Sequence, residues 1–205
     1  FSGVIRIQLS RAGKRRGYAP SNASGVNCLV SLHPLPNLET VKPDGFRAVI
    51  STQVVPDQSP FSGIKSVNRL PQVMAAAEAE VAEADDAFLI NPHGNLVSAT
   101  AGNLFWIDGE TVCTPPLESG CLPGITRQFV LEMCPRLELT VAEKDITAGQ
   151  LAARDGVFIT NSVRGVQSVR SLLNQRLQMS PLIAKLAAAY DAAQATGALE
   201  GPKGS

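Results

Sequence analysis

One lysine stands in a setting where its amine could act as a nucleophile. Lys65 follows Gly63 and has Ile64 and Val67 beside it. Removing water from around a lysine lowers its pKa, and the neutral amine then becomes available for covalent chemistry. The same sequence is also typical of a surface lysine whose aliphatic stem lies along apolar neighbours while its amine stays in water. On this segment alone, the surface lysine is the better interpretation.

Two other segments have the composition of an anion-binding site. Gly124, Ile125 and Thr126 stand at the expected start of a helix, where backbone N–H groups, a hydroxyl and the helix dipole attract an anion. An ordinary capped helix start is an equally good interpretation. Asn161 and Ser162 follow an expected strand and would add donors to the same anion, although such residues usually form turns.

Small polar residues also interrupt an expected strand at residues 96–107. The stretch 98–103 places hydroxyls and an amide, including Ser98 and Asn103, where a buried strand tolerates them only if they are hydrogen-bonded.

These segments must be positioned by alternating strands and helices. Hydrophobic periodicity predicts strands at residues 4–9, 28–32, 46–55, 87–90, 96–107, 111–114, 137–141, 157–160 and 166–169. Helices are predicted at residues 72–84, 123–133, 147–154 and 181–195. Most strands follow one another through short turns, so we expect an α+β fold of mostly antiparallel strands with flanking helices.

The predicted helix at residues 72–84 has an apolar and an acidic side. Val73, Ala76, Ala77 and Val81 can share a buried face. The helix is then expected to turn its glutamates, Glu78, Glu80 and Glu83, toward water.

Composition limits the class of protein. The chain has 205 residues, of which 44% are hydrophobic and 18% charged, enough for one good core or one and a half small domains. Basic and acidic residues number 18 each, which argues against nucleic acid or an anionic membrane as a partner. There is no apolar run long enough to span a bilayer and no signal-peptide pattern.

The cysteines indicate neither a metal site nor a disulfide framework. Cys28, Cys113, Cys121 and Cys134 form no CxxC pair, and both histidines are far from them in sequence. We therefore expect no bound metal, and scattered thiols suit a reducing cytoplasm.

Taken in order, the segments resemble one family. GIKSVNRLPQV, NPHGNLVSATAGNLFW, TPPLESGCLPGITRQ and GVFITNSVRGVQSV look like the fold-type-IV pyridoxal-phosphate enzymes, and most like the aminodeoxychorismate lyases among them. The shared motifs are K-x-x-N-R-L, N-L-F, G-[IV]-x-R-Q and T-N-S-x-x-G, and the opening SRAGKRRGY is similar to an R-G-Y segment of those lyases. Each motif alone is weak, but together they cover about residues 3 to 175 in the family's order.

The resemblance implies roles for the matched residues. Lys65 would form a Schiff base with pyridoxal 5'-phosphate and move protons, while Asn103 would order the strand beside the cofactor ring. The phosphate would be held by Gly124, Ile125 and Thr126, with a further contact from Ser162. The resemblance also implies that Arg16 and Tyr18 help to hold an acidic small-molecule substrate.

The resemblance further implies a domain organisation. Such enzymes are homodimers with a small N-terminal and a larger C-terminal domain, and the first residue, Phe1, is not Met and leads at once into a strand. We expect residues 1–16 to continue from a missing small domain, 17–199 to form the large cofactor-binding domain, and 200–205 to be a tail.

One departure from the family concerns the cofactor ring. The family usually has a glutamate five residues before the N-L-F asparagine, where it pairs with the pyridine nitrogen, and here that residue is Ser98. A serine cannot pair by charge, so the electron sink should be weaker. The expected function is conversion of 4-amino-4-deoxychorismate to 4-aminobenzoate and pyruvate, a step toward folate, in the cytoplasm. The alternatives are a D-amino-acid or branched-chain aminotransferase, and an inactive or binding-only chain.

Overall fold

The computed structural model describes residues 3–12, 25–35 and 44–197. The chain divides into two compact units, residues 1–40 and 41–205. The boundary that we expected between residues 16 and 17 lies outside the described residues, as does the predicted tail at 200–205.

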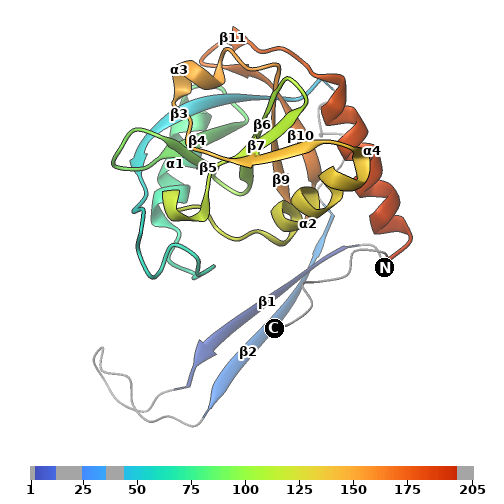
Figure 1. The fold of residues 1–205 in the computed structure, drawn as a ribbon. Coiled ribbons are helices and arrows are strands. Elements are labelled where there is room, and N and C mark those ends of the chain that lie inside the picture. The colour runs from blue at the N-terminus through green and yellow to red at the C-terminus, as the bar shows by residue number, and fades with distance from the viewer. Residues whose placement is uncertain (1–2, 13–24, 36–43, 198–205) are drawn as a thin grey trace. The chain divides into compact units, whose positions relative to one another are not determined.

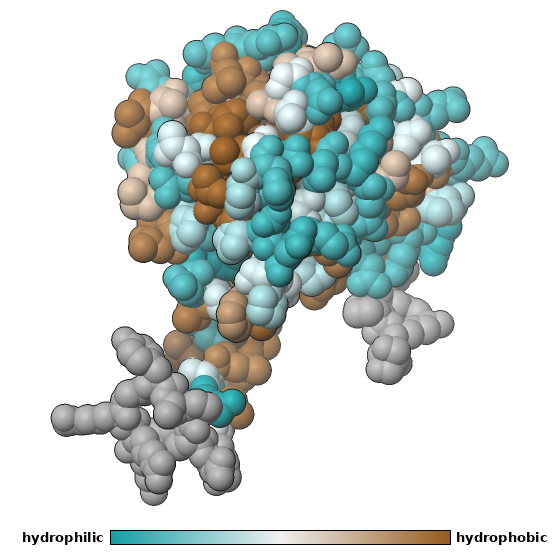
Figure 2. All heavy atoms as spheres, turned by 60° about the vertical axis from the view of Figure 1, so that its left-hand side comes forward, coloured by the Kyte–Doolittle hydropathy of each residue, from teal (hydrophilic) through white to brown (hydrophobic). Residues whose placement is uncertain are grey.

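The first unit is a two-stranded antiparallel ribbon. Its strands are β1 (Gly3–Arg11) and β2 (Val26–Pro34), which confirms both strands expected there. Ile5 lies opposite Leu32 and Ile7 opposite Val30, so these apolar residues share one face of the ribbon. All four are more than half exposed, and apolar side chains are visible along the ribbon in Figure 2.

The second unit is a mixed sheet with helices around it (Figure 1). Its strands are β3 (Phe46–Val54), β4 (Asp86–Ile90), β5 (Leu96–Ala99), β6 (Asn103–Asp108), β7 (Thr111–Thr114), β8 (Thr140–Glu143), β9 (Gly156–Asn161), β10 (Gly165–Leu172) and β11 (Gln175–Arg176). Its helices are α1 (Leu70–Val81), α2 (Ile125–Met133), α3 (Ala148–Leu151) and α4 (Pro181–Ala195), with short 3-10 turns η2 (Leu117–Ser119) and η3 (Cys134–Leu137).

Six of these strands close into a ring. The pairing runs β10–β3–β4–β5–β6–β9 and returns to β10, with β7, β8 and β11 attached outside the ring. The β10–β3 and β3–β4 pairings are parallel, and the other four in the ring are antiparallel. The predicted α+β fold with mostly antiparallel strands is confirmed, although the closure of the ring was not predicted.

The ring separates an inner core from two outer ones. Phe88, Leu104, Trp106 and Ile159 pack inside the ring. Outside it, α1 packs against β3 and β4, whereas α2 packs against β9 and α4 against β10. Because the helices cover separate parts of the ring, each outer face has its own buried cluster.

Our prediction of which face of α1 is buried is wrong. The buried residues are Ala75 and Ala79, whereas Val73 and Val81 are 60% and 87% exposed. Two alanines four residues apart let the helix lie close to β3 and β4, and the larger valines then point away. Glu78 does not simply face water: its carboxylate accepts hydrogen bonds from the Thr52 N–H at 2.8 Å and the Thr52 hydroxyl at 2.6 Å.

Two strand predictions also need correction. The segment 137–141 is not a strand along its length, since residues 134–137 form η3 and Glu138 has a left-handed backbone (φ 62°) before β8 begins at Thr140. The segment 96–107 forms two strands, β5 and β6, which pair antiparallel across the turn at residues 100–102.

Candidate functional site

Three polar residues form one row across neighbouring strands. Ser98 on β5 lies opposite Asn103 on β6, and Asn103 also lies opposite Thr160 on β9. Cross-strand neighbours share a face. Leu89 lies opposite Ser98 and belongs to the cluster beneath α1, outside the ring. The row therefore lies on the outer surface of the ring. Val166, opposite Thr160, packs against the cluster of α2 and α4, so the row crosses the gap between the two helical layers.

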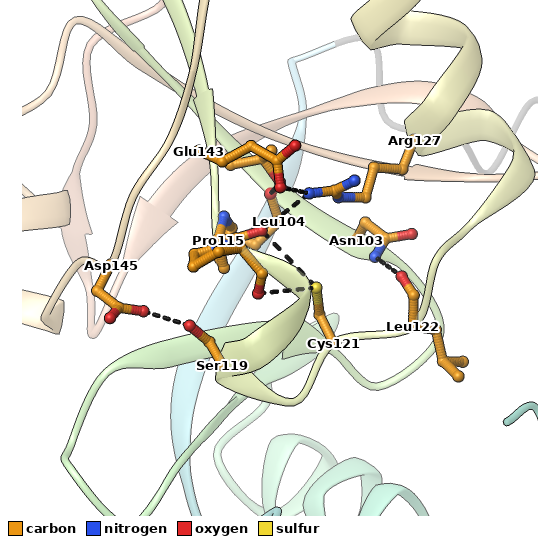
Figure 3. Close-up of polar contacts among 11 residues, drawn as sticks. Asn103, Leu104, Pro115, Ser119, Cys121, Leu122, Arg127, Glu143 and Asp145 are labelled. Carbon is orange, nitrogen blue, oxygen red and sulfur yellow. Dashed lines mark hydrogen bonds and ion pairs between the residues drawn. The ribbon is translucent and has the colours of Figure 1, made fainter. Parts of the chain in front are cut away.

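Asn103 connects this row to the start of α2. Its side-chain amide is 7% exposed and donates a hydrogen bond to the Leu122 carbonyl at 2.7 Å (Figure 3). A Cβ atom on Gly124 would overlap the Asn103 Oδ1. Only glycine fits at residue 124 without movement of Asn103, so the loop before α2 is placed directly over the row.

The N-terminus of α2 is open toward an anion. Gly124 is its N-cap, in extended conformation, and no side chain in the described part of the chain caps the helix. The first N–H groups of a helix have no partner within the helix, and they carry the positive end of its dipole. Thr126 is buried (4% exposed) and Ile125 is exposed. This arrangement supports the interpretation of Gly124, Ile125 and Thr126 as an anion-binding segment.

The loop that precedes α2 is held at several points (Figure 3). The buried guanidinium of Arg127 donates to the Pro115 carbonyl at 3.1 Å and pairs with Glu143 at 2.5 Å. At the other end of the loop, the Ser119 hydroxyl donates to Asp145. A loop fixed in this way presents its backbone groups without a large entropic cost on binding.

Lys65 lies on a loop that reaches the same place. A Cβ on Gly63 would lie 4.0 Å from Cδ of Pro123, next to the start of α2. Lys65 itself is exposed, and so are Ile64 and Val67. In the single chain, Lys65 is therefore a surface lysine, which agrees with the interpretation that we preferred for this segment alone.

The remaining predicted residues are placed less closely. Ser162 is exposed in the turn after β9, two residues beyond Thr160, and Asn161 fixes that turn by accepting hydrogen bonds from the N–H groups of Val163 and Arg164. Within the described residues, no hydrogen bond joins Ser162 to Gly124. Arg16 and Tyr18 lie outside the described residues.

Two residues of the site were missed. The Thr160 hydroxyl is buried and has no hydrogen-bond partner among the residues that the structure describes, which is rare in folded proteins. The buried Asp86 accepts from the Thr100 hydroxyl at 2.6 Å and the Thr100 N–H at 3.1 Å, and so fixes the turn between Ser98 and Asn103. Burial raises the pKa of Asp86. An acid directly before an apolar strand was the available signal, whereas Thr160 is defined only by strand pairing.

A surface hollow of about 370 Å³ lies beside the C-terminal half of α1, at the starts of β3 and β4. Its lining includes Arg47, Ala79, Glu83, Asp86 and Thr100. It includes neither Lys65 nor the start of α2, so we do not assign the site to it.

Comparison with known proteins identifies the family. The model of the amino-transferase class IV family matches residues 1–172. The chain belongs to this family. An aminodeoxychorismate lyase of Vibrio harveyi is 31% identical over 83% of this chain, and a D-alanine aminotransferase of Bacillus licheniformis is 35% identical over 56% of it. The crystal structure of 4-amino-4-deoxychorismate lyase from Pseudomonas aeruginosa, 29% identical, superposes with a TM-score of 0.84 and matches 94% of this chain and 71% of that one.

The class IV family confirms the fold-type-IV architecture and its cofactor, pyridoxal 5'-phosphate; aminotransferases that share the fold were solved with that cofactor or its amine form. The chain spans 64% of the length of the Vibrio relative and 40% of the Bacillus one. No helix within the described residues is long and apolar enough to cross a membrane.

The residues present fit this cofactor. The open N-terminus of α2 offers N–H groups to a phosphate, and the glycine at its cap lets the loop lie directly against Asn103 of the row. The buried, unpartnered Thr160 hydroxyl lies in the row beneath. An ordinary capped helix over a closed sheet would show neither the uncapped first turn nor the unpaired hydroxyl.

Proposed function

We propose that this class IV chain is a lyase that converts 4-amino-4-deoxychorismate to 4-aminobenzoate and pyruvate. The observation that carries the proposal is Ser98, which occupies the row beside Asn103 at the position where the family usually has a glutamate. The similarity to lyases over most of the chain supports the same activity.

We assign each residue a role in this reaction. Gly124, Ile125 and Thr126 bind the cofactor phosphate, with Ser162 as a further contact. Lys65 holds the cofactor covalently and then takes the proton from the substrate carbon that bears the amine. When bound, the cofactor supplies an electron-withdrawing ring that accepts charge from that carbon.

Ser98 favours elimination over amino transfer. A carboxylate beside the ring nitrogen would keep that nitrogen protonated and the electron sink strong, whereas a hydroxyl can only share a hydrogen bond. In the lyase reaction, the C–O bond to the enolpyruvyl group breaks and its electron pair leaves with enolpyruvate, which takes up a proton to become pyruvate. The substrate ring becomes aromatic, so charge leaves the substrate at once. Amino transfer must hold the charge until a proton returns to the cofactor carbon.

The second candidate is a D-amino-acid or branched-chain aminotransferase. The Bacillus D-alanine aminotransferase favours it, because its identity of 35%, although over a shorter segment, is higher than the 31% of the lyase. An aminotransferase with serine at residue 98 would have to work with a weaker electron sink. This physical cost is why we place the lyase first.

The proposal includes a cytoplasmic homodimer. The exposure of Ile64, Val67 and Ile125 around the site in the single chain supports a further surface that covers it. Arg16 and Tyr18 remain proposed contacts of the acidic substrate.

The test is product formation by the full-length protein loaded with pyridoxal phosphate. We expect 4-aminobenzoate and pyruvate to appear in equal amounts from 4-amino-4-deoxychorismate. Amino transfer to a keto acid without 4-aminobenzoate would favour the second candidate. A preparation that gains no visible absorption band with the cofactor would favour a binding-only or inactive chain.

A further inference from the structure

Arg69 reaches back over the loop that carries Lys65. Its Nε donates a hydrogen bond to the Ser66 carbonyl at 3.1 Å, and its Nη2 donates to the Ile64 carbonyl at 3.2 Å. These carbonyls belong to the residues directly before and after Lys65. One guanidinium group therefore holds the backbone on both sides of the lysine.

The backbone at Lys65 is a tight turn that needs such support. The Ser66 N–H donates to the Ile64 carbonyl at 2.8 Å, a γ-turn with Lys65 at its centre, and the Ile64 N–H donates to the Phe61 carbonyl at 3.0 Å. A three-residue turn contains few backbone hydrogen bonds of its own. The exposed neighbours Ile64 and Val67 add little packing to hold this one.

The arginine is itself fixed to the core. Its carbonyl accepts the Val73 N–H at 3.0 Å, and α1 begins at the next residue. Since α1 packs against β3 and β4 through Ala75 and Ala79, the side chain starts from a rigid base. Partial burial lowers the pKa of Arg69, yet a guanidinium stays charged at any physiological pH.

We infer that Arg69 is a positioning residue that aims the amine of Lys65 at the start of α2. The inference rests on the proposed function, in which Lys65 bonds to the cofactor bound there. A planar fork with two fixed donors can hold both carbonyls, whereas an amide or an ammonium cannot reproduce that geometry. The direction in which a lysine leaves the backbone depends on its φ and ψ angles, and these two contacts fix the turn.

The experiment separates an effect on the orientation of Lys65 from an effect on the phosphate site. Full-length parent, Arg69→Gln, Arg69→Lys and the control Arg136→Gln, an exposed arginine on η3, are mixed with pyridoxal phosphate and quenched with borohydride at successive times. Mass spectrometry of the peptide that contains Lys65 gives the rate of adduct formation. Pyridoxamine phosphate, which cannot bond to a lysine, is titrated into the same proteins to measure phosphate-dependent binding.

We expect both Arg69 variants to form the Lys65 adduct slower by about tenfold or more, because a misplaced nucleophile loses most of its advantage of orientation. Pyridoxamine phosphate should bind them as it binds the parent and Arg136→Gln. Amide hydrogen exchange of the peptide around Ser66 should also rise in the cofactor-free Arg69 variants.

Three outcomes would overturn the inference. Equal adduct rates in parent and Arg69 variants would leave the proposed function intact and remove the role of Arg69. Equal loss of adduct rate and of pyridoxamine phosphate binding would mean that Arg69 acts on the whole site or the fold. A parent labelled at a lysine other than Lys65 would overturn the proposed function and the inference together.

Discussion

The side chain of Asn103 lies directly against the backbone of Gly124 and donates a hydrogen bond to the Leu122 carbonyl two residues earlier. A strand start and a helix start, 21 residues apart in sequence, are locked together by this contact. The loop that presents the candidate phosphate site therefore depends on a residue in the row beneath it.

Replacing Gly124 by alanine should displace Asn103. The new Cβ would overlap the Asn103 Oδ1, and overpacking of a buried site costs about 1–3 kcal/mol in the free energy of unfolding. Urea denaturation measures the loss. Gly149→Ala in α3 is the matched control, because a Cβ there meets nothing and alanine should be neutral or slightly stabilising. Equal stability of both variants would show that the loop is free to move.

Thr126→Val tests the phosphate site without changing its shape. If the buried Thr126 hydroxyl donates to the cofactor phosphate, its loss should weaken cofactor binding by about 1.5–3 kcal/mol, the range for a hydrogen bond to a charged group. Titration of the cofactor-free protein with pyridoxal phosphate measures this change. An unchanged affinity would place the phosphate elsewhere.

Lys65→Ala should remove the visible band of the bound cofactor and turnover together. The same amine is proposed to bond to the cofactor and to move the proton, so no other group can replace both roles. Absorbance and product assays on the same sample check this. Substantial residual turnover in the variant would contradict the assignment of Lys65.

Glu78 should make stability depend on pH in the acid range. Hydrogen bonds from Thr52, and then from Gln53, lower its pKa to about 2 from the usual 4.5. The folded chain therefore holds this carboxylate charged more strongly than the unfolded chain does. Its contribution is complete above pH 4.5 and is lost as pH falls toward 2.

The variant Glu78→Gln should accordingly be less stable than the parent near neutral pH. The difference between the two free energies of unfolding should shrink as pH is lowered through this window. Urea denaturation at several pH values, carried out on both proteins, measures it. A difference that stays constant with pH would mean that the Thr52 contact does not hold the charge.

Local signals were enough to predict most elements and to single out several candidate site residues. The bounds of α4, Pro181–Ala195, were predicted correctly, because proline at the first turn marks its start; in the structure Ser180 caps it. Ser98 and Asn103 were proposed as candidates because polar residues inside an apolar strand need a hydrogen-bond partner. The start of α2 was found from Gly124 and Thr126.

Features that depend on long-range pairing could not be predicted. Thr160 joins the row only because β9 pairs with β6 across more than fifty residues of chain. The buried face of α1 depends on how closely β3 and β4 approach it, which periodicity does not specify. The hydrogen bonds from Arg69 to the loop around Lys65 depend on the conformation of the Arg69 side chain, which sequence spacing does not specify.

Ser98→Glu should shift the balance between the two candidate reactions. If the site accommodates the longer side chain, a carboxylate near the ring nitrogen strengthens the electron sink, and each unit of pKa shift is worth about 1.36 kcal/mol. Side transamination of simple amino acids should then rise more than lyase turnover. If the variant's lyase activity rises more than its transamination, residue 98 does not control how strongly the cofactor ring withdraws electrons.

The balance of the two rates in the unaltered full-length protein tests the central claim most directly. With pyridoxal phosphate bound, 4-aminobenzoate formation from 4-amino-4-deoxychorismate is measured beside amino transfer from D-alanine and from branched-chain amino acids. We predict that 4-aminobenzoate forms faster than any of these amino acids is transaminated. A parent that transaminates faster than it forms 4-aminobenzoate would contradict the lyase assignment and the role given to Ser98.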